Sequence, residues 1–492
     1  MEGNTILASR EMDSLLAPYV GEKKDLQSIQ EAIKALERGY HDRGFVAVQV
    51  ILPEQELKDG VVRLKVIEPR LGKITVEGNR FFDEANIRRS LPALRPGAPL
   101  NVVAVSRSIE DANDSPAKKV NLQFLNGGAS GEIDAKIQVQ DEKPWAIGLT
   151  SNTTGDKQTG YWRLEVQFQE ANLFNRDHLV TLQYITSPSN PDQVNIAGLG
   201  YRIPIARLRS SIEIIGAYSN VDSGTLSLAG NSTQVSGSGT ILGLHYNQNL
   251  PGIGRYNQQL TFALDLRAYT NSVVLSGAQL ANDVTVHPIS LTYAGKRAWT
   301  KAAAGFYAGV VHNLPEVAVR DTEAQFEKVR AGAPQDYTIL KFGANVSHSL
   351  VGDWRVHGTF NGQYTNVPLV PGEQFGIGGA TSVRGFHERE AADDKGYAGS
   401  FEIHAPNLRL LPEGMAAQWH ALLFADVGHI SRVNPLPGET PKTTIASFGP
   451  GIRVNGGKRF FVAFDYGVIL DPLTGGKNKW GGLCDMTVSF MY

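Results

Sequence analysis

The residues best placed to form a specific polar contact are an arginine in a glycine-rich stretch and an aspartate further along the chain. Residues 376–386 read GIGGATSVRGF and contain Arg384, and residues 424–428 read FADVG and contain Asp426. A guanidinium in a confined site is costly to desolvate unless a carboxylate pairs with it. The two motifs therefore predict a directional ion pair, which is suited to holding a loop in place. An ordinary surface arginine and an unrelated aspartate would be the simpler interpretation.

Sequence signals for catalysis and metal binding are weak. The chain contains no Gly-x-Ser-x-Gly motif, and the glycines at 237–239 and 376–378 match neither the phosphate-binding nor the dinucleotide-binding pattern. Metal-ligand spacing is absent among the histidines of the predicted strands, which are His357, His404, His420 and His429. The single cysteine, Cys484, forms neither a disulfide nor a cysteine-based metal site within the chain. We therefore expect a protein that is not an enzyme and that uses no metal and no cofactor.

Composition narrows the class of protein. The 492 residues carry a formal net charge of -2, so no basic field indicates nucleic-acid binding. No uninterrupted apolar run reaches the about 18 residues that a membrane-spanning helix needs. A transmembrane β-barrel is compatible with this composition, because its strands alternate apolar residues with polar ones and need no long apolar run. Residues 1–4 lack the basic start of a secretory signal peptide, so we expect an exported protein to be present here in a mature or trimmed form.

The first part of the chain reads as a small α/β unit. Residues 25–44 place apolar side chains at helical spacing. Runs rich in β-branched residues follow at 45–53 and 60–68. A short strand at 5–8 and a short helix at 10–19 precede them. The expected order of elements is therefore β-α-α-β-β.

The same order is expected a second time. The predicted elements of the second copy are a strand at 71–76, helices at 82–94 and 100–114, and strands at 120–124 and 132–139. A repeat of about seventy residues indicates two copies of one module. We place these modules at residues 1–70 and 71–142. Two unrelated soluble α+β domains are the alternative.

From Trp145 onward, alternating runs replace the helical periodicity. They number about sixteen, an even number as in single-chain bacterial barrels. Short linkers are expected at 175–176, 206–208, 251–254, 351–353, 411–414 and 455–457, and long ones at 221–233, 314–335, 370–396, 430–442 and 471–482. This sorting fits an outer-membrane barrel with short periplasmic turns and long external loops, whereas a soluble barrel has no reason for it.

The two faces of the predicted strands differ in polarity. In the last run, Cys484 and Met486 share one face, and Asp485 and Thr487 share the other. An apolar exterior with a polar interior reverses the arrangement of a soluble barrel. By the same alternation, Asp426 is expected to face the barrel lumen.

The first unit resembles the POTRA (polypeptide transport-associated) domain. Its residues 39–79, GYHDRGFVAVQVILPEQELKDGVVRLKVIEPRLGKITVEGN, are similar to the first POTRA of two-partner secretion transporters of the TpsB type. In that family a helix ahead of the first POTRA often plugs the barrel. Since this sequence begins almost at the POTRA-like text, we expect that helix to be absent, trimmed or disordered.

The glycine-rich stretch resembles the inward-folded sixth loop of the outer-membrane assembly and two-partner secretion superfamily. The loop motif is Val383, Arg384, Gly385 and Phe386. The resemblance implies that its arginine pairs with the aspartate of a Phe-x-Asp-x-Gly motif on the inner barrel wall, here Phe424, Asp426 and Gly428. Glu402, in a segment that also resembles the family, is expected to point inward.

The resemblance implies two α+β POTRA domains, at 1–70 and 71–142, followed by a 16-stranded antiparallel transmembrane β-barrel at 143–492 with an inward-folded loop at 370–396. Its implied function is to move an unfolded partner exoprotein from the periplasm to the surface of a Gram-negative cell. The implied location is the outer membrane, with the POTRA domains in the periplasm. The implied partners are the exoprotein, outer-membrane lipids and, during biogenesis, the barrel assembly machinery, with no nucleic acid.

Docking of the exoprotein by strand addition to a POTRA edge is the expected mode of recognition. The candidate edge residues are Phe45, Val48, Val50, Val120, Leu122 and Phe124. Two alternatives stay open. One is an outer-membrane protein assembly factor of the same superfamily, which tends to carry three or more POTRA units. The other is a passive porin, which would have no POTRA units and no Arg384–Asp426 pair.

Overall fold

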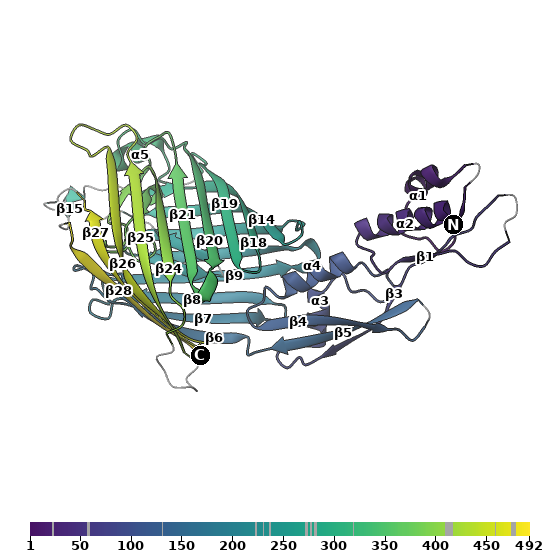
Figure 1. The fold of residues 1–492 in the computed structure, drawn as a ribbon. Helices are drawn as coiled ribbons and strands as arrows, with labels where there is room; N and C mark the ends of the chain where they lie inside the picture. Colours follow the sequence, from purple (N-terminus) through teal and green to yellow (C-terminus); the bar gives the residue numbers. More distant parts are fainter. Residues whose placement is uncertain are drawn as a thin grey trace. The chain divides into compact units, whose positions relative to one another are not determined.

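The computed structural model describes residues 1–492 except 22–23, 57–59, 130, 222–223, 230, 236–237, 271–273, 276–277, 280–282, 318, 409–416, 458 and 474–478 (Figure 1). The chain forms two compact units. The first contains Met1–Pro144, Ala171–Asp177 and Ala206–Arg209. The second contains Trp145–Glu170, His178–Ile205 and Ser210–Tyr492.

The first module of unit 1 packs two helices on a small sheet. Its elements are α1 (Ser9–Leu16), the 3-10 helix η1 (Ala17–Tyr19), α2 (Leu26–Asp42), β1 (Gln49–Ile51) and β2 (Lys65–Ile67). The Asp25 side chain caps α2 by accepting from the Ser28 backbone N–H. Leu36 and Tyr40 of α2 are fully buried against the sheet. Burial raises the pKa of the Tyr40 phenol to about 12. No helix in the described part of the chain is long and apolar enough to cross a membrane.

The prediction of a strand at residues 5–8 is wrong. The described chain instead forms a parallel bridge between Glu2 and Lys65. The physical reason is that the Glu68 carboxylate, far along the chain, accepts from the backbone N–H groups of Thr5 and Ile6 and so replaces a strand partner for them. The strands expected at 45–53 and 60–68 are also shorter, with three residues each in β1 and β2.

The second module has the expected order of elements. It comprises β3 (Arg70–Glu77), α3 (Glu84–Ser90), α4 (Val102–Ala112), β4 (Lys118–Asn126) and β5 (Glu132–Asp141). The sheet order is β3-β5-β4, with β3 parallel and β4 antiparallel to β5. Asp83 and Asn101 cap the two helices by accepting backbone N–H groups. In this sheet β4 is a terminal strand.

Unit 2 is a closed barrel of antiparallel strands (Figure 1). Its wall is formed by β6 (Trp145–Asn152), β7 (Arg163–Leu173), β8 (His178–Thr186), β9 (Asn195–Ile205), β10 (Ser210–Ser219), β13 (Gly239–Asn249), β14 (Tyr256–Tyr269), β17 (Val284–Val286), β18 (Pro288–Ala298), β19 (Ala302–Asn313), β20 (Thr338–Ser349), β21 (Arg355–Tyr364), β24 (Lys395–His404), β25 (Gln418–Ser431), β26 (Lys442–Gly456), β27 (Phe460–Asp471) and β28 (Gly482–Met491). Strand β28 pairs with β6 and closes the wall.

Two of these strands share one position in the wall. Both β17 and β18 pair with β14 and are separated only by His287. Counted as one, they leave a barrel of 16 strands in the described chain, which confirms the predicted fold class.

The connections between wall strands contain further elements. These are η2 (Ala206–Leu208), the hairpin β11 (Gly224–Leu228) and β12 (Asn231–Val235), the hairpin β15 (Val274–Leu275) and β16 (Ala278–Gln279), α5 (Glu323–Val329), η3 (Val351–Asp353), η4 (Pro371–Glu373), and the pair β22 (Phe375–Ile377) and β23 (Ala391–Asp393). Helix α5 lies at one end of the barrel in Figure 1. The linker predicted at 411–414 lies outside the described residues.

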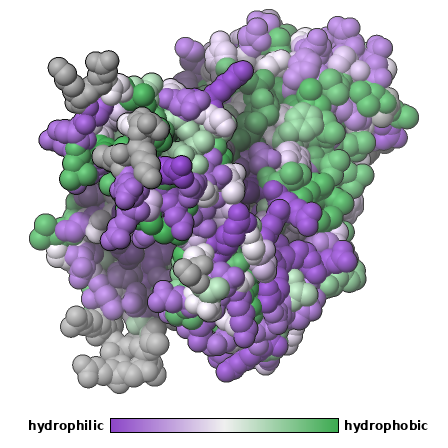
Figure 2. All heavy atoms as spheres, turned by 90° about the vertical axis from the view of Figure 1, so that its right-hand side faces the viewer, coloured by the Kyte–Doolittle hydropathy of each residue, from purple (hydrophilic) through white to green (hydrophobic). Residues whose placement is uncertain are grey.

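The wall alternates between an apolar exterior and a polar interior. On β25, Leu423 and Val427 are exposed, whereas Asp426 between them is 3% exposed. Asp465 on β27 and Asp485 on β28 are likewise buried. Figure 2 shows one face of the molecule, on which hydrophobic surface gathers toward the right of the view. The predicted reversal of polarity is therefore present in the wall, and Asp426 faces the lumen.

Candidate functional site

The loop between β21 and β24 folds back against the inner wall of the barrel. Its tip carries Val383 and Phe386, which are buried to 0% and 1% exposure. They pack in an apolar cluster with Ile377 of the same loop and with Ala398, Ile430, Ile445 and Ile469 from β24, β25, β26 and β27. The loop tip therefore has a seat that four neighbouring strands build together.

A close approach of two backbones completes this seat. Gly385 has φ +89°, in the region that favours glycine, and a Cβ built there would lie 2.8 Å from the carbonyl oxygen of Gly467 on β27. A Cβ on Gly428 of β25 would lie 3.0 Å from Ile377 and from Val383. Both positions therefore need glycine, because a side chain would push the loop off the wall.

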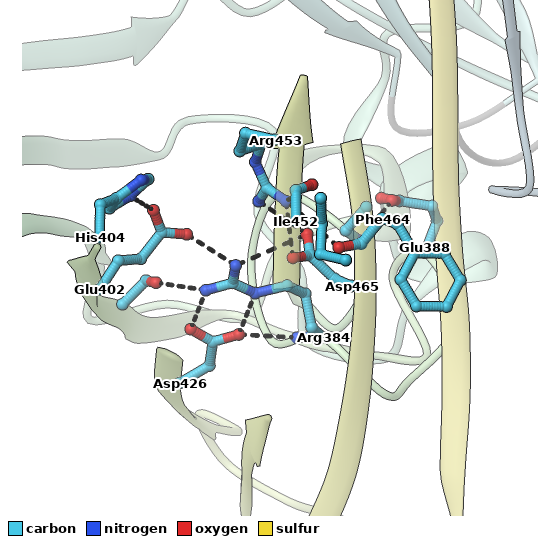
Figure 3. Close-up of polar contacts among 11 residues, drawn as sticks. Arg384, Glu388, Glu402, His404, Asp426, Ile452, Arg453, Phe464 and Asp465 are labelled. Carbon is cyan, nitrogen blue, oxygen red and sulfur yellow. Dashed lines mark hydrogen bonds and ion pairs between the residues drawn. The ribbon is translucent and has the colours of Figure 1, made fainter. Parts of the chain in front are cut away.

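Arg384 forms a bidentate ion pair with Asp426. Its Nε donates to Oδ2 at 2.7 Å and its Nη2 donates to Oδ1 at 2.8 Å. The backbone N–H of Arg384 donates to the same carboxylate at 3.1 Å. The Arg384 guanidinium also reaches β24, where its Nη1 donates to Glu402 at 2.6 Å and its Nη2 donates to Ser400 at 2.9 Å (Figure 3). One side chain therefore ties the loop to β24 and β25.

Two further groups surround the guanidinium. Its central carbon lies 3.6 Å from the centroid of the Phe424 ring, a cation–π contact. Asp465 on β27 lies 3.7 Å from Nη1 and is itself paired with Arg453 through two bonds of 2.8 Å. Figure 3 shows Asp426 and Asp465 on different sides of the guanidinium. The loop is thus tied electrostatically to three strands.

The pair is suited to fixing a position more than to adding stability. Arg384 is 3% exposed and the side chain of Asp426 is fully buried. Desolvating two charges offsets much of their attraction, yet removing one partner strands the other, at about 3–5 kcal/mol for a buried pair. The loop therefore has one well-defined resting place.

The structure brings together all the loop and wall residues that the sequence singled out. They are Val383, Arg384, Gly385, Phe386, Glu402, Phe424, Asp426 and Gly428. Sequence reasoning missed four contributors: Ser400, His404, Arg453 and Asp465. His404 contacts the second oxygen of Glu402 at 2.8 Å. The available signal was the lumen-facing parity of charged residues on β24, β26 and β27.

The first candidate edge for strand addition is partly occupied. Val48 and Val50 belong to the buried core of the first module, and Phe45 packs against it. The backbone N–H of Val50 donates to the Glu37 carboxylate at 3.1 Å. An incoming strand would have to displace that carboxylate, so β1 is the weaker edge.

The second candidate edge is more accessible. At Val120 the Asn113 side chain occupies both backbone groups, with bonds of 2.6 and 3.0 Å. Residues two apart on a strand point the same way, so the backbone groups of Leu122 and Phe124 also point away from β5. Phe124 is 38% exposed. The β4 edge beyond Val120 is therefore the better docking position.

Metal ligands do not gather anywhere in the described ranges, where no group of three or more His, Cys, Asp or Glu side chains is arranged to hold an ion. The observed features instead define a class of protein. They are a closed antiparallel barrel with an apolar exterior, a charged lumen, an inward-folded loop and small α/β modules that precede the barrel in the sequence. These are the features of an outer-membrane barrel protein.

Comparison with known families identifies the particular family. Residues 131–454 match the haemolysin secretion/activation protein ShlB/FhaC/HecB family, and residues 1–69 match the ShlB-type POTRA domain. Because the first match covers more than half of the sequence, the chain belongs to this family. It is an outer-membrane protein with its N-terminal POTRA region in the periplasm, as predicted.

Individual relatives agree with this assignment. The outer-membrane transporter CdiB of Dickeya dadantii is 29% identical over 171 residues, which cover 35% of this chain and 30% of that protein. The heme/hemopexin transporter HuxB of Haemophilus influenzae is 22% identical over 403 residues, which cover 80% of this chain and 69% of that protein. The solved structure of CdiB from Escherichia coli superposes with a TM-score of 0.80 at 19% identity, covering 100% of this chain and 89% of that one.

Proposed function

We propose that this protein secretes a partner exoprotein across the outer membrane, with the POTRA modules receiving the unfolded chain and the barrel forming the pore. The observation that carries the proposal is the loop tip held in the lumen by Arg384, Asp426 and Glu402. A passive porin has no need of a loop with so specific a seat. The relatives CdiB and HuxB are named as transporters, which supports the proposal.

The recognition step is strand addition on the second module. An extended segment of the exoprotein pairs with the backbone of β4 at Leu122 and Phe124, where the edge is not covered by Asn113. Backbone pairing accepts many sequences, so it suits an unfolded substrate. The outer membrane holds no ATP, and folding of the exoprotein outside the cell supplies the drive.

The proposal includes two further partners. The apolar exterior of the barrel contacts outer-membrane lipids, and the barrel assembly machinery inserts it. With a net charge of -2, the protein has no positive electrostatic field that would attract nucleic acid. The protein acts as a channel and not as an enzyme, and the secreted partner belongs to one of the classes that use such transporters: adhesins, haemolysins, contact-dependent toxins or haem-scavenging proteins.

Depletion of the protein from its native host tests this function. A secretion transporter serves one exoprotein, so we expect that exoprotein to disappear from the cell surface and medium while other outer-membrane barrels stay at their normal levels. Quantitative proteomics of the outer membrane and the medium measures both. A general loss of barrels would show that the protein is an assembly factor instead, and no change in any exoprotein would leave the porin alternative.

A further inference from the structure

The base of the same loop has a second polar anchor, far from Arg384. Glu373, at the end of η4, is 3% exposed. Its carboxylate accepts from Arg267 at 2.9 and 3.2 Å and from the Tyr269 hydroxyl at 2.7 Å. Both donors lie on β14. The Tyr269 hydroxyl also lies 3.1 Å from the carbonyl oxygen of Gly372.

The two anchors lie on opposite sides of the lumen. The tip reaches β27 through Gly385, and the base reaches β14 through Glu373. In the closed wall, seven strand positions separate β14 from β27 in either direction. In one direction they are β18 (whose position β17 shares), β19, β20, β21, β24, β25 and β26. In the other direction they are β13, β10, β9, β8, β7, β6 and β28. The loop therefore crosses the lumen and contacts the wall on two opposite sides.

A cavity lies beside the base of the loop. Its volume is about 540 Å³, and its lining includes His245, Asp265, Arg267, Lys341 and Arg389. The wall residues that line it come from β10, β13, β14, β19, β20, β21 and β24, and none of its described lining belongs to strands β25 to β28. The cavity therefore runs beside the loop from its base at Glu373 to Thr381 and Ser382 near the tip.

The two anchors differ in what their release leaves behind. When Glu373 leaves, Arg267 keeps Asp265 as a partner at 2.7 Å, and His245 holds the same Asp265 at 2.8 Å. When Arg384 leaves, Asp426 loses the one cationic side chain that bonds it among the described residues. Stranding a buried charge is the costly event. In terms of stranded charge, release of the Glu373 carboxylate therefore costs less than release of the Arg384 guanidinium.

We propose that the Glu373 contact with Arg267 and Tyr269 is the gate of this pore. Release of the base widens the existing cavity into a path along the wall from β13 to β21, while the tip stays seated on β24 to β27. Glu373 is then a positioning residue for the loop. The inference deepens the proposed secretion function, on which it rests for its purpose, but the opening itself is a property of the barrel.

The first test is the conductance of the purified full chain in planar lipid bilayers. Glu373→Gln removes one of the two carboxylates that Arg267 pairs with, and is expected to raise the equilibrium constant for the open state by about a hundredfold. Because Arg267, Lys341 and Arg389 then face the cavity with one carboxylate fewer, the open state shifts toward chloride selectivity in a KCl gradient. A current and selectivity equal to those of the parent protein would overturn the proposal.

Matched variants control this measurement. Glu390→Gln makes the same change in the same loop, where the carboxylate accepts from the His387 backbone N–H, and should leave conductance unchanged. Tyr269→Phe removes the other donor to Glu373 without altering a charge, and it should likewise raise the equilibrium constant for the open state. It also keeps the proposal testable should Glu373→Gln not fold, which heat-modifiable gel migration detects.

A crosslink tests which end moves. In a Cys484→Ser background, Val383→Cys with Ile430→Cys places two thiols in the apolar cluster between tip and wall. With Glu373→Gln added, we expect the same open current before and after reduction of the disulfide. If the open current appeared only after reduction of the disulfide, the tip would have to move for the pore to open, which would overturn the proposal that the tip stays seated. Since the readout is current through the isolated barrel, a channel that opens but serves no exoprotein would refute the secretion function and leave the gate intact.

Discussion

At the residue scale, the position of the loop depends on the geometry of one guanidinium. Arg384 bonds Asp426 through two nitrogens while reaching Ser400 and Glu402 with the remaining donors. A planar fork can do this, whereas the ammonium of lysine is a point charge with three donors. Charge alone is therefore not what the site requires.

This geometry predicts that Arg384→Lys behaves like Arg384→Ala. Both variants should strand Asp426, release the loop tip and lower secretion of the exoprotein, with about 3–5 kcal/mol lost from the seated state. Secretion is measured by immunoblot of the medium, and barrel folding by heat-modifiable gel migration. The control is Arg389→Lys in the same loop, whose guanidinium bonds the carbonyl oxygens of Gln374 and Pro371. Normal secretion from folded Arg384→Ala would remove this pair from the mechanism.

At the scale of elements, strand β4 is the terminal strand of its sheet and carries the proposed docking edge. The N–H group of Leu122 points away from β5, so proline at this position removes a docking donor without removing a bond of the sheet. Leu122→Ala removes the side chain and keeps the donor.

We therefore predict that Leu122→Pro weakens binding of the exoprotein by about tenfold, as expected for the loss of one or two backbone hydrogen bonds. Leu122→Ala should bind almost as tightly as the parent protein. Titration of the full chain in detergent with the N-terminal secretion region of the exoprotein gives both affinities. Equal affinities for the proline and alanine variants would exclude strand addition at this edge.

The same strand begins with a buried lysine whose ionisation is linked to folding. Lys118 donates to Asp177 at 2.7 Å and to Asn86 at 2.8 Å, and its ammonium lies 5.0 Å from the centroid of the Phe82 ring. Burial lowers the pKa of Lys118 below its ordinary value of 10.5, although the charge of Asp177 acts in the opposite direction. The unfolded chain therefore binds more protons between the two pKa values, and the free energy of unfolding increases as the pH rises through that window.

This contact predicts the behaviour of two variants. Asp177→Asn leaves the Lys118 charge buried without its carboxylate and should lower the free energy of unfolding of unit 1 by about 3–5 kcal/mol. Adding Lys118→Met should restore part of this loss, because no charge is then buried. Limited proteolysis of the full chain across a urea series measures the unfolding of unit 1, with a pH series to about 10 for the slope. Additive losses in the double variant would refute the pairing.

At the scale of the whole molecule, the chain combines a POTRA-containing unit with a closed barrel, and most of this organisation could be predicted from sequence. The strands from Trp145 to Tyr492 were predictable because alternation with period two and sorted loop lengths leave few other folds. The strand expected at 5–8 was not, because the Glu68 carboxylate competes for its N–H groups across a long separation in sequence.

The candidate site divides in the same way. The Arg384 loop motif was readable in the sequence, its pairing with Asp426 and the inward side of Glu402 followed from the resemblance to the superfamily, and strand parity placed Asp426 in the lumen. The contacts of Asp465 and Arg453, and the anchor of Glu373 on Arg267 and Tyr269, became visible only in the folded barrel. The reason is physical: closing a barrel brings together strands far apart in the chain, and no local pattern records which lumen-facing charges then meet.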